Sequence, residues 1–349
     1  MPVLDELEDA ILRDPDDLAA YAVYGDYLAE QGDPRGELIA TQLAADATDD
    51  PELRRAALRV FARHRAYFVG ALDSMIAPDA FKWRAGFIQR AVLAHDRLLI
   101  EDGERVAKSL ADVVETLLAH PSARYLTELV VRTNDRDMWG RTVGSQKDVV
   151  DKIAAARPRV LRRLQLGDAS YGASHVGSLA DLWPVLAPLR ELAVEGEFTL
   201  GPLALPALER ATFRPTPLRR RGARELVDAV WPALHRLELH LESALQHVSR
   251  ELVALLHRED MPALAHLALD GASDGDRLVA ELVRSPLVPR LVTLDLRRGT
   301  LSDCGARMLL ARPEVFAHLT RIDVSEGALS RITCARLRNA LPNVVGNSP

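Results

Sequence analysis

Apolar residues recur in a fixed frame along the second half of the chain. The frame is a leucine, two residues, an apolar residue, one more residue and a second apolar residue, as in LVTLDL from Leu291. The alternation at its end is the period of a short strand with one buried face. Five of the seven steps between neighbouring frames are 26 to 30 residues long, which is typical of a repeat protein. The eight frames begin at Leu126, Leu161, Leu189, Leu208, Leu234, Leu264, Leu291 and Leu319.

The segments between the frames have the spacing of helices. In GDRLVAELVRSPL (275–287) and CGARMLLARPEVF (304–316), apolar residues recur every three or four positions and a proline interrupts the pattern. A strand and a helix of this size cannot bury an apolar side alone, so neighbouring units must stack. We therefore predict an α/β solenoid over residues 81–349, with parallel strands on its concave face and helices on its convex face. We expect the short repeat from Leu208 to lack a full helix, so that LRRRGAR (218–224) forms a basic loop, either solvated or in contact with phosphate or an acidic partner.

The first eighty residues have a different pattern. Apolar positions follow one face of two helices, which are separated by the segment QGDPRGE (31–37). Within that segment, we expect Arg35 to reach Asp26 or Glu30. The pattern predicts a helical hairpin inside a separate helical domain, residues 1–80. Three signals stop one helix and start the next, namely a glycine that can be left-handed, an N-capping aspartate and a proline: Gly32, Asp33 and Pro34.

Two stretches resemble known families. LVTLDLRRGTLSDCGARMLL (291–310) resembles the long leucine-rich repeats of proteins like ribonuclease inhibitor, although the asparagine that this family has after the strand is replaced here. That resemblance covers roughly residues 87–341. VYGDYLAEQGDPRGELIATQ (23–42) resembles the repeat-companion domain found beside repeat arrays in bacteria. The resemblance implies a solenoid whose N-terminal module is either a structural cap or a docking element. The matching residues include Asp26, Asp33, Pro34, Arg35 and Gly36.

Composition and the lack of known motifs limit the kinds of functional site that we expect. Hydrophobic residues make up 48% and charged residues 27% of the 349 residues, and no run of eighteen apolar residues is present. The acidic N-terminal segment lacks the pattern of a signal peptide and two cysteines make no disulfide framework, so we expect a cytoplasmic protein. No Gly-rich phosphate loop, Gly-x-Ser-x-Gly motif or Cys/His ligand spacing occurs. We therefore expect no catalytic residue, no cofactor and no metal site, and a protein that is a monomer on its own.

Charge is unevenly distributed along the chain. Residues 1–50 hold fourteen acidic and two basic residues, whereas the net charge of the whole chain is −6. The acidic part is either a solvated helix face or a module that attracts a basic partner or the chain's own basic body. A pI near 6.0 argues against nucleic acid as a partner, and we expect no membrane partner either.

Strand alternation also predicts which side chains leave the core. The third, fifth and seventh positions of each frame should point onto the concave face. The third position is largely arginine, at Arg163, Arg210, Arg236 and Arg321. The later positions are rich in acids, which should form a patch near the C-terminal end. The candidate partner-binding residues at these positions are Arg214, Glu238, His240, Asp270, Asp295, Arg297 and Asp323.

Two interpretations of this patch are open. The acids are either neutralised by cross-strand pairs, such as Arg297 with Asp295 or Asp323, or they bind a basic peptide. Trp139, in the polar insertion 134–146, is either a further contact or a packed side chain. The leading function is non-catalytic binding of a protein or peptide on the concave face or loops of the array. The alternative is a subunit that recognises a peptide substrate for a separate enzyme.

Overall fold

The computed structural model describes residues 2–101, 104–105, 109–132, 146–168, 174–241 and 249–346. Within these residues the chain is an α/β protein with a mostly parallel open sheet and many helices. It divides into two compact units, Met1–Gln165 and Leu166–Pro349. The domain boundary predicted at residue 80 stays a prediction.

The first unit begins with helices and continues with short strands and further helices. Its helices are α1 (Pro2–Arg13), α2 (Leu18–Glu30), α3 (Pro34–Thr48), α4 (Pro51–Arg63), α5 (Arg65–Val69), α6 (Leu72–Met75), α7 (Leu110–Ala119) and α8 (Gln146–Ala156). Its strands are β1 (Phe81–Arg84), β2 (Phe87–Ala94), β3 (Ile100–Glu101), β4 (Glu104–Arg105), β5 (Glu128–Arg132) and β6 (Arg163–Leu166). The strand order in its main sheet is β1-β2-β5-β6, with β1 antiparallel to β2 and β2 parallel to β5.

The predicted helical hairpin is present as α2 and α3. Gly32 is left-handed, with φ 75°, just after the end of α2. The Asp33 carboxylate accepts a hydrogen bond of 2.8 Å from the backbone N–H of Arg35 and so caps α3. Pro34 occupies the first turn of α3, where no backbone N–H is needed. These three predicted stop and start signals are confirmed.

An aromatic cluster joins α2 to the first parallel strand. Tyr21 and Tyr24 of α2 pack against Phe87 of β2, with ring centroids 6.0 and 6.2 Å apart. Tyr125 packs edge-to-face on Phe87 at 4.7 Å. Because these rings are buried together with aliphatic residues of α1 and α3, the hairpin shares one core with the start of the sheet.

The second unit alternates strands with helices. Its strands are β7 (His175–Ser178), β8 (Glu191–Thr199), β9 (Arg210–Pro215), β10 (Arg236–His240), β11 (His266–Asp270), β12 (Thr293–Asp295), β13 (Arg321–Asp323) and β14 (Val344–Val345). Its helices are α9 (Arg220–Asp228), α10 (Ser249–Leu256), α11 (Gly275–Leu282), α12 (Asp303–Ala311), α13 (Pro313–Phe316) and α14 (Arg331–Ala340). The strands from β8 to β14 are neighbours in chain order, β7 pairs with β8, and all these pairings are parallel.

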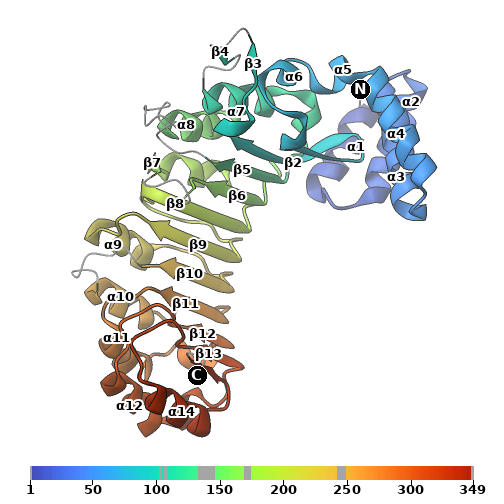
Figure 1. The fold of residues 1–349 in the computed structure, drawn as a ribbon. Coiled ribbons are helices and arrows are strands. Elements are labelled where there is room, and N and C mark those ends of the chain that lie inside the picture. Colours follow the sequence, from blue (N-terminus) through green and yellow to red (C-terminus); the bar gives the residue numbers. More distant parts are fainter. Residues whose placement is uncertain are drawn as a thin grey trace. The chain divides into compact units, whose positions relative to one another are not determined.

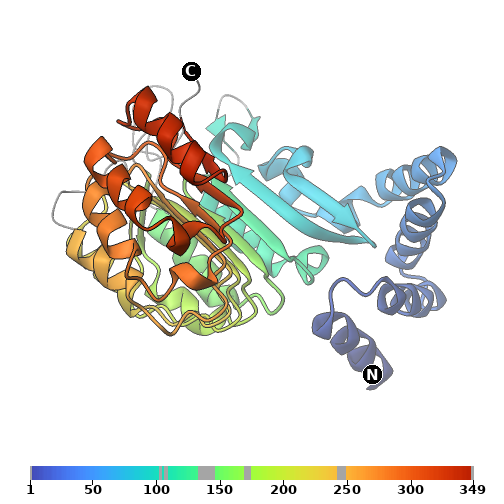
Figure 2. The same cartoon turned by 90° about the horizontal axis from the view of Figure 1, so that it is seen from below.

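The eight leucine frames are strands. In every frame the strand begins two residues after the first leucine, as β10 does after Leu234. The fourth and sixth residues of each frame are buried, for example Leu237 and Leu239 at 0% exposure. Helices α9 to α12 lie along one side of the strands of this unit (Figures 1 and 2). The other face of β8 to β13 is left open by the described elements of the unit.

The prediction of which repeat lacks a helix is wrong. The repeat from Leu208 contains α9, and LRRRGAR, predicted as a loop, lies mostly within that helix. The repeat from Leu189 has no helix, because irregular chain fills residues 200–209 between β8 and β9. The repeat from Leu161 has a 3-10 helix, Ala180–Val185, and no α-helix among its described residues. The short step of 19 residues follows Leu189, so it shortens that repeat and leaves the next one complete.

None of the helices in the described ranges combines the length and the apolar character that a bilayer crossing needs. Of the two cysteines, Cys334 is buried and Cys304 is exposed, and both are free thiols.

Candidate functional site

The candidate site is the open face of strands β8 to β13. Parallel strands paired in register bring equivalent positions of successive repeats side by side, about 4.8 Å apart. From β9 to β13 the third frame positions therefore form a row across the sheet, which we call the donor row: Arg210, Arg236, His266, Thr293 and Arg321. The fifth positions of the same strands form a second row, which we call the acidic row: Thr212, Glu238, Ala268, Asp295 and Asp323. In β8 the same two positions are Glu191 and Ala193.

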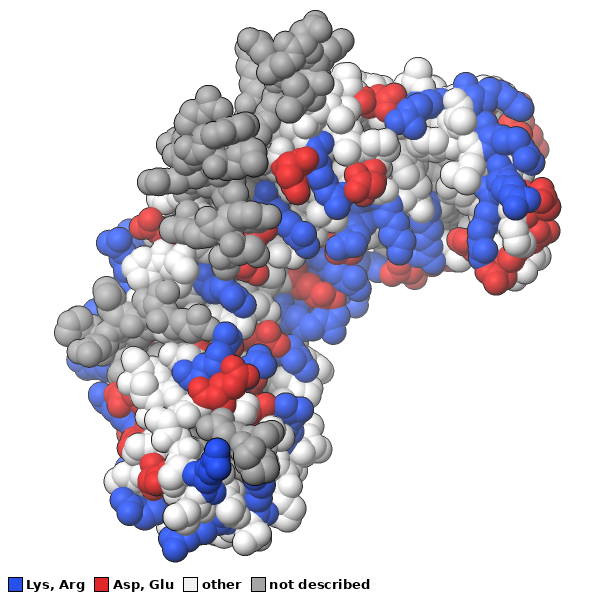
Figure 3. Space-filling view, in the orientation of Figure 1, with Lys and Arg blue, Asp and Glu red and all other residues white. Residues whose placement is uncertain are grey.

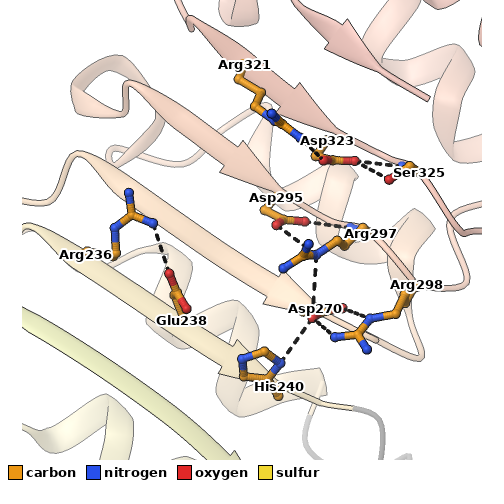
Figure 4. Close-up of polar contacts among 10 residues, drawn as sticks. All are labelled: Arg236, Glu238, His240, Asp270, Asp295, Arg297, Arg298, Arg321, Asp323 and Ser325. Carbon is orange, nitrogen blue, oxygen red and sulfur yellow. Dashed lines mark hydrogen bonds and ion pairs between the residues drawn. The ribbon is translucent and has the colours of Figure 1, made fainter. Parts of the chain in front are cut away.

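The arginines of the donor row are paired with carboxylates. Arg236 donates to Glu238 at 3.0 Å and Arg321 donates to Asp323 at 2.7 Å, each across one residue of the same strand (Figure 4). Arg210 donates to Glu191 of the neighbouring strand. Between these arginines, His266 Nδ1 and Thr293 Oγ1 are 2.8 Å apart.

In each pair the arginine is the more exposed partner. The side chains of Arg210, Arg236 and Arg321 are 51%, 46% and 58% exposed. Their partners Glu191, Glu238 and Asp323 are 28%, 31% and 6% exposed. The space-filling view shows basic and acidic side chains interspersed over the visible face of this unit (Figure 3). The site therefore presents guanidinium groups outward and keeps carboxylates beneath them.

Asp270 is the centre of a buried polar cluster. Its carboxylate is 1% exposed and accepts hydrogen bonds from Arg298, through Nε at 2.7 Å and through Nη2 (Figure 4). Arg297 Nε lies 3.7 Å away and His240 Nδ1 lies 3.1 Å away. Burial alone would raise the pKa of the Asp270 carboxyl, but Arg298, His240 and Arg297 together hold it below its usual value. Asp270 is thus a buried anion that Arg298 and Arg297 compensate.

The pKa values of Asp323 and Asp295 are shifted in opposite directions. Burial opposes ionisation of Asp323, but hydrogen bonds from Arg321 and Ser325 keep its pKa below the usual value. Burial raises the pKa of Asp295, and the neighbouring charges of Asp323 and Asp270 raise it further, against the opposing effect of Arg297. Arg297 Nε lies 3.2 Å from Asp295, as the neutralising interpretation expects.

His240 and Arg214 complete the set of candidates on this face. Burial lowers the pKa of His240, and the charge of Arg214 lowers it further, while Asp270 and Glu238 act in the opposite direction. Arg214 is half-buried in β9, and in the described part of the chain its Nε has no hydrogen-bond partner.

The four acids of the predicted patch, Glu238, Asp270, Asp295 and Asp323, lie together on this face (Figure 4), but two of them are not exposed. Asp270 and Asp323 are buried, because Arg298 and Arg321 lie against their carboxylates. Sequence reasoning missed Arg298, which follows β12 in a left-handed conformation with φ 57° and reaches back to the preceding repeat. The only signal for it was the run Arg297-Arg298-Gly299, which is typical of a turn.

Arg35 of the N-terminal motif is an internal residue. Its guanidinium donates to the carbonyl oxygen of Gly86 at 2.5 Å and to Ser122 Oγ at 3.0 Å. It also lies over the ring of Phe87, 4.6 Å from the centroid. The expected contact with Asp26 or Glu30 is replaced by these contacts, since Arg35 is 4% exposed and points towards the turn between β1 and β2.

The rest of the motif positions Arg35. Gly36 is buried, and a Cβ there would lie 2.4 Å from the backbone nitrogen of Ala29, so only glycine allows α2 and α3 to approach this closely. Asp33 also accepts a hydrogen bond of 2.8 Å from the hydroxyl of Tyr67. Asp26 is exposed and Pro34 is partly exposed. A direct docking role for the whole motif conflicts with the burial of Arg35 and Gly36 in the folded unit.

The first unit also contains a cavity of about 430 Å³. Apolar side chains form most of its lining, including Phe61 of α4 and Trp83 of β1, whose rings meet edge-to-face at 4.9 Å. At its rim, Arg65 makes a bidentate ion pair with Asp73. The cavity of the first unit is therefore lined mainly by apolar groups, whereas the charged candidate residues lie on the sheet face of the second unit.

No group of three or more His, Cys, Asp or Glu side chains in the described ranges could hold a metal ion. Trp139 and most of the predicted insertion 134–146 lie outside the described residues.

Comparisons with known proteins concern the fold. No model of a protein family matches the sequence, and no curated protein matches it either. Among solved structures, a protein of Bacteroides fragilis from a structural genomics consortium is similar, with a TM-score of 0.59 and 20% sequence identity. The similarity covers 67% of this chain and 68% of that one. It is compatible with a repeat-type α/β fold.

Proposed function

We propose that this chain is a leucine-rich-repeat protein that binds a segment of another protein on the open face of its parallel sheet. The observation that carries the proposal is the alternation in β8 to β13. One face of these strands holds the apolar core, and the other holds rows rich in charged and polar side chains that no described helix of the unit covers. An extended face of this kind suits binding of an elongated partner.

The helices before β1 have a structural role in this proposal. An open repeat array exposes the core of its first repeat unless another element covers it. The shared aromatic core of Tyr21, Tyr24, Phe87 and Tyr125, and the contacts of Arg35 with the β1–β2 turn, support such a cap. We propose that the repeat-companion motif is the part of this cap that holds the hairpin against β2.

A steric block on the sheet tests the binding function. Ala268 lies in the middle of the acidic row and is partly exposed, so Ala268→Trp fills the face without removing an ion pair. Ala335→Trp on the exposed side of α14 is the matched control. A protein captured by the tagged chain should be lost with Ala268→Trp and retained with Ala335→Trp. Equal capture by both variants would rule out the sheet face as the binding surface.

A further inference from the structure

The donor row exposes hydrogen-bond donors and hides the acceptors that balance them. Each row arginine contacts its carboxylate through one terminal nitrogen, whereas a guanidinium carries five N–H donors. Donors therefore remain on side chains that are about half exposed. Asp323, by contrast, accepts from Arg321, from the Ser325 backbone and from the Ser325 hydroxyl, and it is almost fully buried. Its acceptor capacity is used inside the protein.

The same arrangement recurs in the first unit. Arg90 and Arg163 both contact Glu128, at 2.7 and 3.6 Å. The two arginines are 43% and 55% exposed, while Glu128 is 22% exposed. In both units the cation lies outside and the carboxylate beneath it.

We propose that the donor row binds an extended acidic segment of a partner protein, one rich in Asp and Glu. This inference rests on the proposed function and fixes the chemistry of its partner. Four strand spacings separate Arg210 from Arg321, about 19 Å. A segment of about six extended residues spans that distance, and its carboxylates can meet the arginines at both ends. His266 and Thr293 provide uncharged polar groups in the middle of the row.

The observations favour an acidic peptide over the two other charged partners. A basic peptide would need unpaired carboxylates at the surface. Asp270 and Asp323 are buried and already compensated. The partly exposed Glu238 and Asp295 are paired with Arg236 at 3.0 Å and with Arg297 at 3.2 Å. A nucleic acid would need a surface of one positive sign. Here Glu238 and Asp295 lie in the adjacent row, so the face lacks the unbroken positive surface that a continuous phosphate backbone needs, whereas separate carboxylates of a peptide can meet single arginines.

Selection from a random twelve-residue peptide display library tests the chemistry of the partner. The full-length chain should enrich peptides in Asp and Glu several-fold over the input library. The triple variant Arg210→Gln, Arg236→Gln and Arg321→Gln should lose that enrichment. An acidic peptide selected in this way should bind the triple variant at least about tenfold more weakly than it binds the original chain. A control triple on exposed helical positions, Arg277→Gln, Arg307→Gln and Arg336→Gln, should behave like the original chain.

Other outcomes overturn the inference. Enrichment of Lys and Arg, or acidic enrichment that survives the row triple variant, means that the donor row does not select acidic segments. Binding of a 20-nucleotide single-stranded RNA that is tighter than the selected peptide and depends on the same arginines also overturns it. Retained circular dichroism of both triple variants excludes unfolding as the cause. The Ala268→Trp capture result decides the proposed function separately, because a non-acidic partner can still be blocked there.

Discussion

Asp270 offers the sharpest test of how the open face is held together. Asp270→Asn keeps the size of the side chain, removes its charge and leaves Arg298, Arg297 and His240 around a neutral group. Hydrogen bonds between charged groups contribute about 1.5–3 kcal/mol each, and Arg298 donates two to this carboxylate. Arg297 and Arg298 are 41% and 35% exposed, so water can compensate them in part.

The expected loss is therefore smaller than for a fully buried pair, whose rupture costs about 3–5 kcal/mol. We expect Asp270→Asn to lower the free energy of unfolding of the second unit by about 2–3 kcal/mol. For a unit of this size that corresponds to a fall of about 4–12 °C in Tm. The matched control is Glu238→Gln, which removes a carboxylate of the same face from a partly exposed pair and should cost less than about 1 kcal/mol.

Hydrogen exchange of β10 to β12 peptides at increasing urea concentrations measures these changes within the second unit. The pH dependence adds a second criterion. The pKa of Asp270 is depressed in the fold, so its contribution is present above the unfolded-state pKa and is lost as the pH falls through the folded-state pKa. The gap between Asp270→Asn and the original chain should close below about pH 4. Equal costs for Asp270→Asn and Glu238→Gln at pH 7 would refute the account of a buried, compensated anion.

Three further substitutions test other parts of the structure. Arg35→Lys keeps the charge but cannot bridge Gly86 and Ser122, and we expect urea denaturation of the first unit to show a loss of about 2–3 kcal/mol. Gly36→Ala forces α2 and α3 apart and should cost about 1–3 kcal/mol in the same assay; an unchanged midpoint would contradict the close approach. Asp295→Asn should gain stability relative to the original chain as the pH rises through the folded-state pKa, which lies above 3.8, because ionised Asp295 is disfavoured. A pH titration of the unfolding midpoint measures this difference.

The repeat frame made the strands of the second unit predictable. Its fourth and sixth positions are buried in every repeat. Residues two apart on a strand point to the same face, so an alternating pair of apolar residues predicts a strand with that face in the core. The sequence prediction placed the missing helix in the repeat from Leu208, which was wrong. The short step from Leu189 to Leu208 is the length of the repeat that begins at Leu189, so the shortening belongs to that earlier repeat. Leu189, with the short step after it, therefore marks a repeat that has no helix.

The alternation of side chains along the strands predicted which residues of the site point away from the core, but not how deeply each of them is buried. Asp270 stands at an outward position of β11, yet Arg298 from the following repeat covers it. That contact joins residues 28 positions apart and depends on a left-handed turn residue, so no local pattern specifies it. The burial of Arg35 has the same origin, because its partners Gly86 and Ser122 are 51 and 87 positions away.

The charge that the open face presents to a partner depends more on the lengths of its side chains than on the numbers of acidic and basic residues. Residues two apart on a strand share a face, so Arg236 with Glu238 and Arg321 with Asp323 are neighbours there. Arg297, in the turn after β12, lies 3.2 Å from Asp295. Arginine is the longer side chain and keeps its charged end in water while its stem covers apolar or polar neighbours. The shorter carboxylate is consequently the one that loses water, whichever residue comes first along the strand. In all three pairs the arginine is more exposed than its acid. A row with balanced charges can therefore present a cationic surface to a partner.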